Sequence, residues 1–234
     1  MNGPNSPSKQ GLFVTGTGTD VGKSVVAASI VAALTASGKR VAAFKPAVSG
    51  LDDAGSEWLA DHELLAKATG WQAAESVCGN VFGPSVSPHL AAELAATVID
   101  TGALLADVGG LKADAEVLIC EGVGGLMVPL TLEFSVLDLM IALDLPVVVV
   151  ANATLGTINA TRLTVDRLRL AGLQVAAVVL NRWPAQPSAL ELSNRDTLTA
   201  VLAVDVVTFG DTTPDQLAAA GSALPLDAWL SVAT

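Results

Sequence analysis

A glycine-rich turn near the start of the chain carries the residue types that bind phosphate. Residues 16–24 read Gly-Thr-Gly-Thr-Asp-Val-Gly-Lys-Ser and lie between an expected strand and an expected helix. Glycines allow backbone N–H groups to curve around a polyphosphate, and the start of a helix adds partial positive charge. The Lys23 ammonium could reach the outer phosphate oxygens, and the Ser24 hydroxyl could bind Mg²⁺. The turn therefore predicts a site for a nucleoside triphosphate.

The spacing of this turn differs from the standard phosphate-loop pattern by one position. That pattern has a glycine five residues before Gly22, but Thr17 stands there, and Gly16 lies one residue further back. The Gly-Lys-Ser ending and the position between strand and helix are both kept. An ordinary glycine-rich turn with a surface lysine is the structural alternative, and we favour the phosphate site over it.

Two more charged residues follow expected strands. Lys45 ends the second expected strand, and Glu121 follows an apolar strand and precedes Gly122 and Gly124. In open parallel sheets, ligands bind at the carboxyl ends of the strands, so both residues stand where a site is expected. A carboxylate beside glycines that let phosphate approach is a good Mg²⁺ ligand. The alternatives are a solvated lysine at a strand end and a carboxylate that merely caps a strand.

The remaining sequence supports a single α/β domain. The chain has 234 residues, of which 51% are hydrophobic and 15% charged, and this excludes disorder as its overall state. We expect a disordered tail over residues 1–10 and one domain over residues 11–234. The expected strands lack polar alternation, which indicates a doubly wound, mostly parallel sheet with helices on both faces. We expect strands at 11–15, 41–45, 116–120, 146–151 and 174–180, at most a short strand at 77–82, and helices at 23–37, 56–69, 135–143, 157–171 and 188–203.

The charge balance limits the partners. Twelve Lys and Arg against 23 Asp and Glu give a net charge of -11, which disfavours nucleic acid and anionic membranes. We find no signal peptide and no apolar run near the length of a membrane span, so we expect a cytoplasmic protein. Cys78 and Cys120 are expected as buried thiols in a reducing compartment. A small anion such as ATP needs only local positive potential and is not excluded.

The glycine-rich turn resembles the extended phosphate loop of the dethiobiotin synthetases, the P-loop ATPases of biotin biosynthesis. Four further blocks follow in that family's order, over residues 44–50, 85–89, 121–129 and 155–159. The resemblance implies a P-loop fold and an ATP-dependent ring closure. It implies the substrates 7,8-diaminopelargonate, CO₂ or bicarbonate, and ATP, with a carbamate and a carbamic–phosphoric anhydride as intermediates. ADP and phosphate would be released with the cyclic urea.

The resemblance also implies roles for individual residues. Lys23 and Lys45 would be catalytic, with Lys45 and Ser49 at the carbamate or diamine. Mg²⁺ would be held by Ser24, Asp61 and Glu121, although a solvated helix face explains Asp61 nearly as well. The nucleotide would contact the residues Thr19, Asp20, Val21, Gly22, Lys23, Ser24, Val25, Asp61, Glu121, Gly122, Gly124 and Asn181, the last matching the family's base-reading asparagine.

A homodimer is implied in the same way. Gly156, Thr157 and Asn159 open an expected helix, and in the family this helix start holds the substrate's carboxylate tail across a two-fold interface. Ala160 stands where a histidine often follows the asparagine.

The competing hypothesis is a ParA- or MinD-like ATPase switch, which binds DNA or membrane. That group has an additional lysine early in the loop, where this chain has Gly18, and the acidic charge balance also opposes it.

Overall fold

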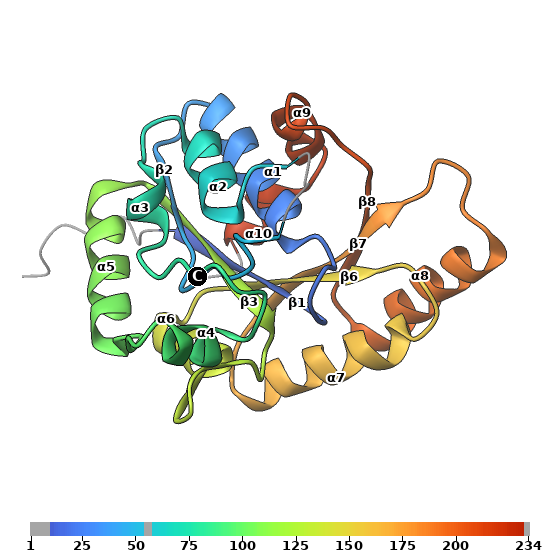
Figure 1. Ribbon diagram of the computed structural model, residues 1–234. Coiled ribbons are helices and arrows are strands. Elements are labelled where there is room, and N and C mark those ends of the chain that lie inside the picture. Colours follow the sequence, from blue (N-terminus) through green and yellow to red (C-terminus); the bar gives the residue numbers. More distant parts are fainter. Residues whose placement is uncertain (1–9, 54–57, 232–234) are drawn as a thin grey trace, which may run out of the picture.

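A six-stranded sheet forms the centre of the protein. The computed structural model describes residues 10–53 and 58–231 (Figure 1). The strands pair in the order β2-β3-β1-β6-β7-β8, and every pairing between them is parallel. Their bounds are Gln10–Gly16 for β1, Val41–Phe44 for β2, Val117–Gly125 for β3, Val147–Asn152 for β6, Val175–Trp183 for β7 and Asp205–Gly210 for β8. From β1 the chain runs to the edge strand β2, returns to β3 beside β1, and then continues outward through β6, β7 and β8 on the other side, which confirms the doubly wound sheet.

Helices cover both faces of this sheet (Figure 1). One face packs against α1 (Lys23–Ala36), α2 (Asp61–Thr69), α3 (Ala74–Val77), α9 (Leu217–Ser222) and α10 (Leu226–Ser231). The other face packs against α4 (Pro88–Leu94), α5 (Thr101–Asp114), α6 (Val136–Leu143), α7 (Thr157–Leu170) and α8 (Ala189–Leu202). A small antiparallel pair, β4 (Pro129–Thr131) and β5 (Phe134–Ser135), precedes α6.

The strands are apolar on both sides because each side faces a core. In β1, Leu12 and Val14 point into the core beneath α1, and Phe13 points into the opposite core. All three side chains are at most 1% exposed. The absence of polar alternation in the sequence is therefore explained by two buried faces.

Two expected boundaries are corrected by the structure. Residues 1–9 of the expected tail lie outside the described residues, but Gln10 already belongs to β1 and pairs with Val117. The expected helix 56–69 begins only at Asp61, where the Ala60 N–H donates to Glu63. Residues 56 and 57 of the expected helix lie outside the described residues. Over residues 77–82, where at most a short strand is expected, α3 ends at Val77 and Val81 makes a single bridge to Val48.

Two strands are longer than their apolar runs. Backbone pairing continues in β3 through Glu121, which lies opposite Val14, and in β7 through Asn181, which lies opposite Asn152. A polar side chain does not interrupt a ladder whose hydrogen bonds come from the backbone. Both residues are therefore fixed inside strands. The sequence patterns also did not identify α5, β8, α9 and α10.

Candidate active site

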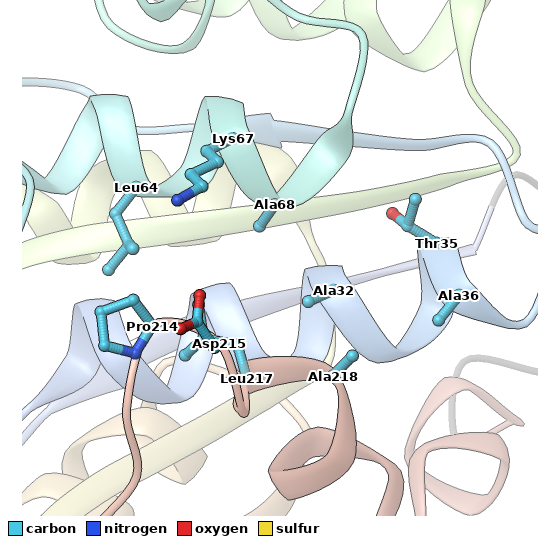
Figure 2. Close-up of a pocket in the computed structure, with 10 residues that line it drawn as sticks. All are labelled: Ala32, Thr35, Ala36, Leu64, Lys67, Ala68, Pro214, Asp215, Leu217 and Ala218. Carbon is cyan, nitrogen blue, oxygen red and sulfur yellow. The ribbon is translucent and has the colours of Figure 1, made fainter.

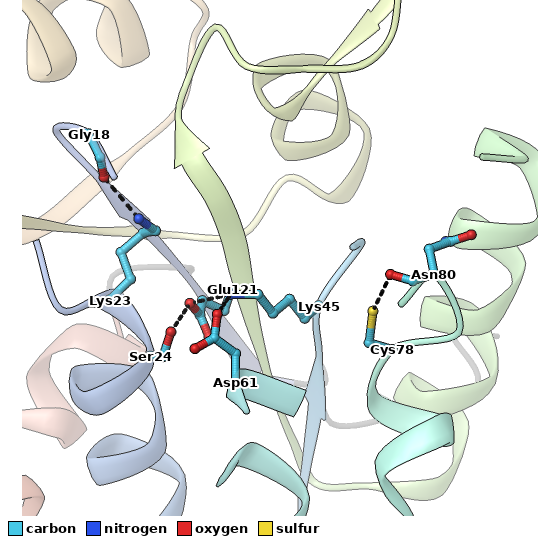
Figure 3. A network of polar contacts seen from close by, with 8 residues as sticks. All are labelled: Gly18, Lys23, Ser24, Lys45, Asp61, Cys78, Asn80 and Glu121. Carbon is cyan, nitrogen blue, oxygen red and sulfur yellow. Dashed lines mark hydrogen bonds and ion pairs between the residues drawn. The ribbon is translucent and has the colours of Figure 1, made fainter. Parts of the chain in front are cut away.

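The carboxyl ends of β1, β2 and β3 bring a group of charged side chains together. The Lys45 Nζ lies 2.6 Å from Glu121 Oε1 and 2.7 Å from Asp61 Oδ2. The Ser24 hydroxyl donates to the same Glu121 oxygen at 2.7 Å. Figure 3 shows Ser24 and Lys45 meeting Glu121 on either side. We call these four residues the lysine–carboxylate cluster.

Three members of this cluster lie at or next to the end of a secondary-structure element, and the fourth lies inside a strand. Lys45 follows the last residue of β2, and Glu121 lies within β3 on the side of the sheet that faces α1. Ser24 is in the first turn of α1, and Asp61 is the first residue of α2. Because the parallel strands end at one edge, residues that are 76 and 97 positions apart come into contact there.

Burial makes the electrostatics of the cluster strong. Glu121 is 0% exposed and Lys45 is 2% exposed. Burial alone would lower the pKa of Lys45, but Glu121 and Asp61 raise that pKa above its ordinary value, so the ammonium is kept. Burial raises the pKa of Glu121, and Lys45 opposes this shift. Burial also acts to raise the pKa of Asp61, but Lys45 lowers it below the usual aspartate value.

The phosphate loop ends beside the cluster. Lys23 is 6% exposed, and its Nζ donates to the Gly18 carbonyl at 2.9 Å. Burial lowers the pKa of Lys23. Gly22 has a φ of 83°, and a Cβ added there would lie 1.9 Å from Asn181 Nδ2, so the position requires glycine. Among the other predicted nucleotide residues, Thr19 and Asp20 are exposed, whereas Val21 is buried and Val25 is half-buried.

The glycines after Glu121 have two different surroundings. A Cβ on Gly122 would come within 3.2 Å of Phe13 and Val136, so this glycine serves packing. Gly124 has a φ of 61°, and a Cβ there would come within 2.7 Å of Val128 and would lie 3.7 Å from the Thr19 hydroxyl of the phosphate loop. Gly124 is therefore the one of the two that lies against the loop.

The oxygen atoms of the cluster fit Mg²⁺. Ser24, Asp61 and Glu121 offer hard oxygen donors, and the buried Glu121 Oε2 has no hydrogen-bond partner among the described residues. Within residues 10–53 and 58–231 no three His, Cys, Asp or Glu side chains gather as metal ligands. Two carboxylates and a hydroxyl match the way Mg²⁺ is usually held, by few protein ligands together with substrate phosphates.

The predicted substrate residues do not join this cluster. The Ser49 hydroxyl donates to the Val86 carbonyl at 2.8 Å. Gly156 caps the start of α7 with a φ of 94°, Thr157 is buried against Thr161, and Asn159 is exposed. In the described part of the chain, no hydrogen bond or ion pair connects these residues to Lys45, Asp61 or Glu121.

A cavity of about 290 Å³ lies elsewhere, between α1, α2 and the segment that leads into α9 (Figure 2). Its lining is mostly alanine and leucine, with Lys67 and Asp215 as charged residues. No predicted site residue borders it. The chemistry is therefore assigned to the edge of the sheet and not to this cavity.

Known proteins resemble the chain along most of its length. A family described as an AAA domain matches residues 10–210. The "ATP-dependent dethiobiotin synthetase BioD" of Anaeromyxobacter sp. (strain Fw109-5) is 43% identical over 173 residues, which is 74% of this chain and 77% of that protein. The protein of the same name from Rhodococcus jostii (strain RHA1) is 39% identical over 198 residues, or 84% of each chain.

Solved structures share the fold at low identity. The septum site-determining protein MinD of Pyrococcus horikoshii OT3, complexed with Mg-ADP, superposes with a TM-score of 0.56 at 16% identity and covers 96% of this chain and 94% of that one. The cell division ATPase MinD of Pyrococcus furiosus gives a TM-score of 0.54 at 17% identity, covering 96% and 90%. At these identities the likeness shows a common fold and nothing of function.

Proposed function

This chain belongs to the family of ATP-dependent dethiobiotin synthetases, and from that membership we propose that it closes the cyclic urea of dethiobiotin. One amine of 7,8-diaminopelargonate forms a new N–C bond to CO₂ and gives a carbamate. A carbamate oxygen takes the γ-phosphoryl group of ATP, and ADP leaves. The second amine then attacks the carbamate carbon, and phosphate leaves with that oxygen as the ring closes.

The position of the Lys45 ammonium is the observation that supports this chemistry most strongly. This ammonium is held at 2.6 and 2.7 Å by two carboxylates and is almost fully buried, so its position is fixed before any substrate arrives. We assign it to the carbamate, where a positive charge stabilises the oxygen that accepts the phosphoryl group. Ser49, which follows in the same loop, is assigned to the diamine or carbamate.

Lys23 and the phosphate loop are assigned to the triphosphate. Lys23 donates to a carbonyl of its own loop, and a phosphate oxygen is a stronger acceptor for an ammonium than a neutral carbonyl is. The N–H groups at the start of α1 would add to this binding. Asp20 lies in the same loop at a φ of 58° and is exposed.

We assign Mg²⁺ to Ser24, Asp61 and Glu121. Bound there, the ion would neutralise charge on the phosphate oxygens during transfer. Among the residues themselves, Glu121 accepts hydrogen bonds from both Ser24 and Lys45, so it also orients those two side chains.

The carboxylate tail of the diamine is assigned to the start of α7 in a second copy of the chain. Free N–H groups at a helix start bind carboxylates, and Gly156 opens α7 without a side-chain cap. Exposed Leu155 and Leu163, at 85% and 64%, are consistent with a neighbouring subunit on this helix. We therefore expect a C₂ homodimer with Gly156, Thr157 and Asn159 serving the partner's site.

The remaining features are expectations of the same proposal. We expect one P-loop domain over residues 11–234, a cytoplasmic location, and small molecules rather than nucleic acid or membrane as ligands. The net charge of -11 supports the last point. In the described residues, no helix has the length and apolar character of a membrane span.

The test is the substrate dependence of ADP release. We expect release only when 7,8-diaminopelargonate and bicarbonate are both present with Mg·ATP. ATP turnover that ignores the diamine but rises with DNA or lipid vesicles would instead favour a ParA- or MinD-like switch.

A further inference from the structure

Lys45 already provides the lysine–carboxylate cluster with a cation. Its Nζ lies 2.6 Å from Glu121 Oε1 and 2.7 Å from Asp61 Oδ2, and both carboxylates belong to the residues assigned to Mg²⁺. The third assigned residue, Ser24, donates to the same Glu121 oxygen at 2.7 Å. The ammonium and the metal therefore depend on the same small set of oxygen atoms (Figure 3).

The Lys45 ammonium is held in this position by its surroundings. Lys45 is 2% exposed, and its backbone N–H donates to the Val77 carbonyl at 2.9 Å. Burial acts to lower the pKa of Lys45, but Glu121 and Asp61 raise this pKa above its ordinary value, so the side chain stays charged. Removal of one partner from a buried ion pair leaves an uncompensated charge, so the pair persists while no other cation replaces the ammonium.

The charges around the cluster are balanced without a metal. Lys23 and Lys45 carry the positive charges, and Asp61 and Glu121 carry the negative ones. Burial lowers the pKa of Lys23, and the other three side chains are close enough to act on this pKa as well. The other charged residue of the phosphate loop, Asp20, is exposed. A divalent ion added to this group would bring two positive charges that the chain itself does not offset.

A metal at the cluster would also lie close to the Lys45 ammonium. Mg²⁺–oxygen bonds are about 2.1 Å long, so an ion that shared Glu121 Oε1 or Asp61 Oδ2 with Lys45 would lie less than about 5 Å from Nζ. Glu121 Oε2 has no hydrogen-bond partner among the described residues, and an ion bound there would be only slightly further away. At such distances in a buried site, a divalent ion and an ammonium repel each other strongly.

A bound nucleotide would offset this repulsion, because its phosphate oxygens are negative and are themselves ligands of Mg²⁺. We propose that Lys45 is an internal counter-ion of the lysine–carboxylate cluster, which keeps Mg²⁺ from binding alone and makes metal binding conditional on the nucleotide. The identity of the metal and of the nucleotide rests on the proposed function. The counter-ion itself rests on the contacts of Lys45 with Glu121 and Asp61.

The test measures metal binding to the full chain in the absence of substrate. Mn²⁺ is the probe, because the EPR signal of the free ion decreases as the ion binds. Without nucleotide, we expect Lys45→Met to bind Mn²⁺ at least about tenfold more tightly than the wild type, since two carboxylates then lack a cation. Lys67→Met, which removes an exposed lysine of α2, should bind Mn²⁺ as the wild type does. With ADP present, the wild type and Lys45→Met should both bind Mn²⁺.

Two further variants show where the ion binds and keep the test independent of folding. Glu121→Gln in the Lys45→Met background should abolish the gained binding, because the ion loses a carboxylate ligand. If Lys45→Met does not fold, Lys45→Gln, which is uncharged but still polar, carries the same comparison. Thermal unfolding is a second readout: Mn²⁺ should raise the Tm of Lys45→Met and leave the Tm of the wild type unchanged.

Two results would overturn the inference. One is equal affinity of the wild type and Lys45→Met for Mn²⁺ without nucleotide. The other is a gain of binding in Lys45→Met that survives Glu121→Gln, because the ion would then bind outside the cluster. None of these measurements uses the diamine. If the wild-type protein consumes no diamine, the proposed function fails, but the Mn²⁺ titrations still decide whether Lys45 controls metal binding.

Discussion

The two ends of the proposed site are built in opposite ways. At the phosphate end, three strand ends and two helix starts of one chain converge, and Lys45 and Glu121 are in contact and almost fully buried. At the start of α7, Gly156 and Asn159 are exposed, and no charged residue among those described faces them in a hydrogen bond or ion pair.

This difference matches two different tasks, stabilisation of charge at the phosphate end and binding of the substrate's carboxylate tail at the start of α7. Charges that must stabilise a developing negative charge are most effective when they are fixed in advance, and burial within one chain fixes them. A carboxylate tail needs only donors that come into place on binding, and a second chain can supply these. We infer that the phosphate end works as a unit within each chain and that the tail end is completed by a partner.

Replacement of Lys45 tests the phosphate end with the largest expected effect. Lys45→Met should lower kcat by roughly 10³, because the charge that stabilises the accepting oxygen is lost. ADP binding should persist, since Lys23 and the loop remain. The exposed Lys67 of α2 is the matched control, and Lys67→Met should leave kcat unchanged. Near wild-type turnover of Lys45→Met in a steady-state ADP-release assay would remove Lys45 from the mechanism.

Replacement of Glu121 tests whether the same end holds the metal. Glu121→Gln keeps the shape but loses the charge, so the Mg²⁺ concentration for half-maximal rate should rise by about 10 to 100-fold. Titration of activity with Mg²⁺ measures this, with Glu133→Gln on the exposed turn between β4 and β5 as control. Unchanged metal dependence of Glu121→Gln would mean that another group binds the ion.

Replacement of Asn159 tests the tail end. Asn159→Ala should raise the KM for the diamine by about tenfold, with the KM for ATP unchanged, because one hydrogen bond to the substrate carboxylate is lost. A change in the KM for ATP of the same size would place this residue with the phosphate end instead.

Mixed dimers then test whether the two ends come from different chains. In a dimer of Lys45→Met with Asn159→Ala, one site carries both changes and the other carries neither. Random mixing should restore roughly a quarter of wild-type activity at low diamine concentration. Activity no higher than the average of the two separate variants would show that each site is built by one chain.

A pH series tests the electrostatics of the cluster and has the smallest expected effect. Burial would raise the pKa of Asp61, but Lys45 lowers it below its ordinary value, so the ionised form stabilises the fold above about pH 4 and this contribution is lost as pH falls. Because the Asp61 side chain is 41% exposed, Asp61→Asn should cost only about 1 kcal/mol at pH 7 and almost nothing near pH 3. Urea unfolding at both pH values measures the difference. If Asp61→Asn lowered the free energy of unfolding by the same amount at both pH values, the ion pair between Asp61 and Lys45 would not contribute to stability.

The sequence predicted the elements and the chemistry better than the contacts. The glycine-rich turn, Lys45 and Glu121 were identifiable because their residue types stand at the ends of apolar runs. Asp61 could not be separated from a solvated helix face, since its contact with Lys45 depends on where α2 begins after a loop. The sequence pattern predicted Glu121 and Asn181 to follow strands that in fact contain them. Backbone pairing does not depend on whether a side chain is apolar, so hydropathy does not show where a strand ends.

Other parts of the structure have no local motif in the sequence that would identify them. Asn194 is one polar residue in a helix with several, and only the packing of α8 beside the loop before α7 gives it a partner. Helix α5 and strand β8 were missed as well. Here the tertiary arrangement, and not a motif, determines what a residue contacts.

The most direct measurement of the central claim follows the carbon of bicarbonate into the product. Protein, Mg·ATP, 7,8-diaminopelargonate and ¹³C-bicarbonate should give a cyclic urea that carries one ¹³C atom, with one ADP released per ring, as read by mass spectrometry and an ADP assay. Lys45→Met should give neither in appreciable amount. Release of ADP without a labelled ring product would contradict the account, because the cluster at the edge of the sheet would then serve a different reaction.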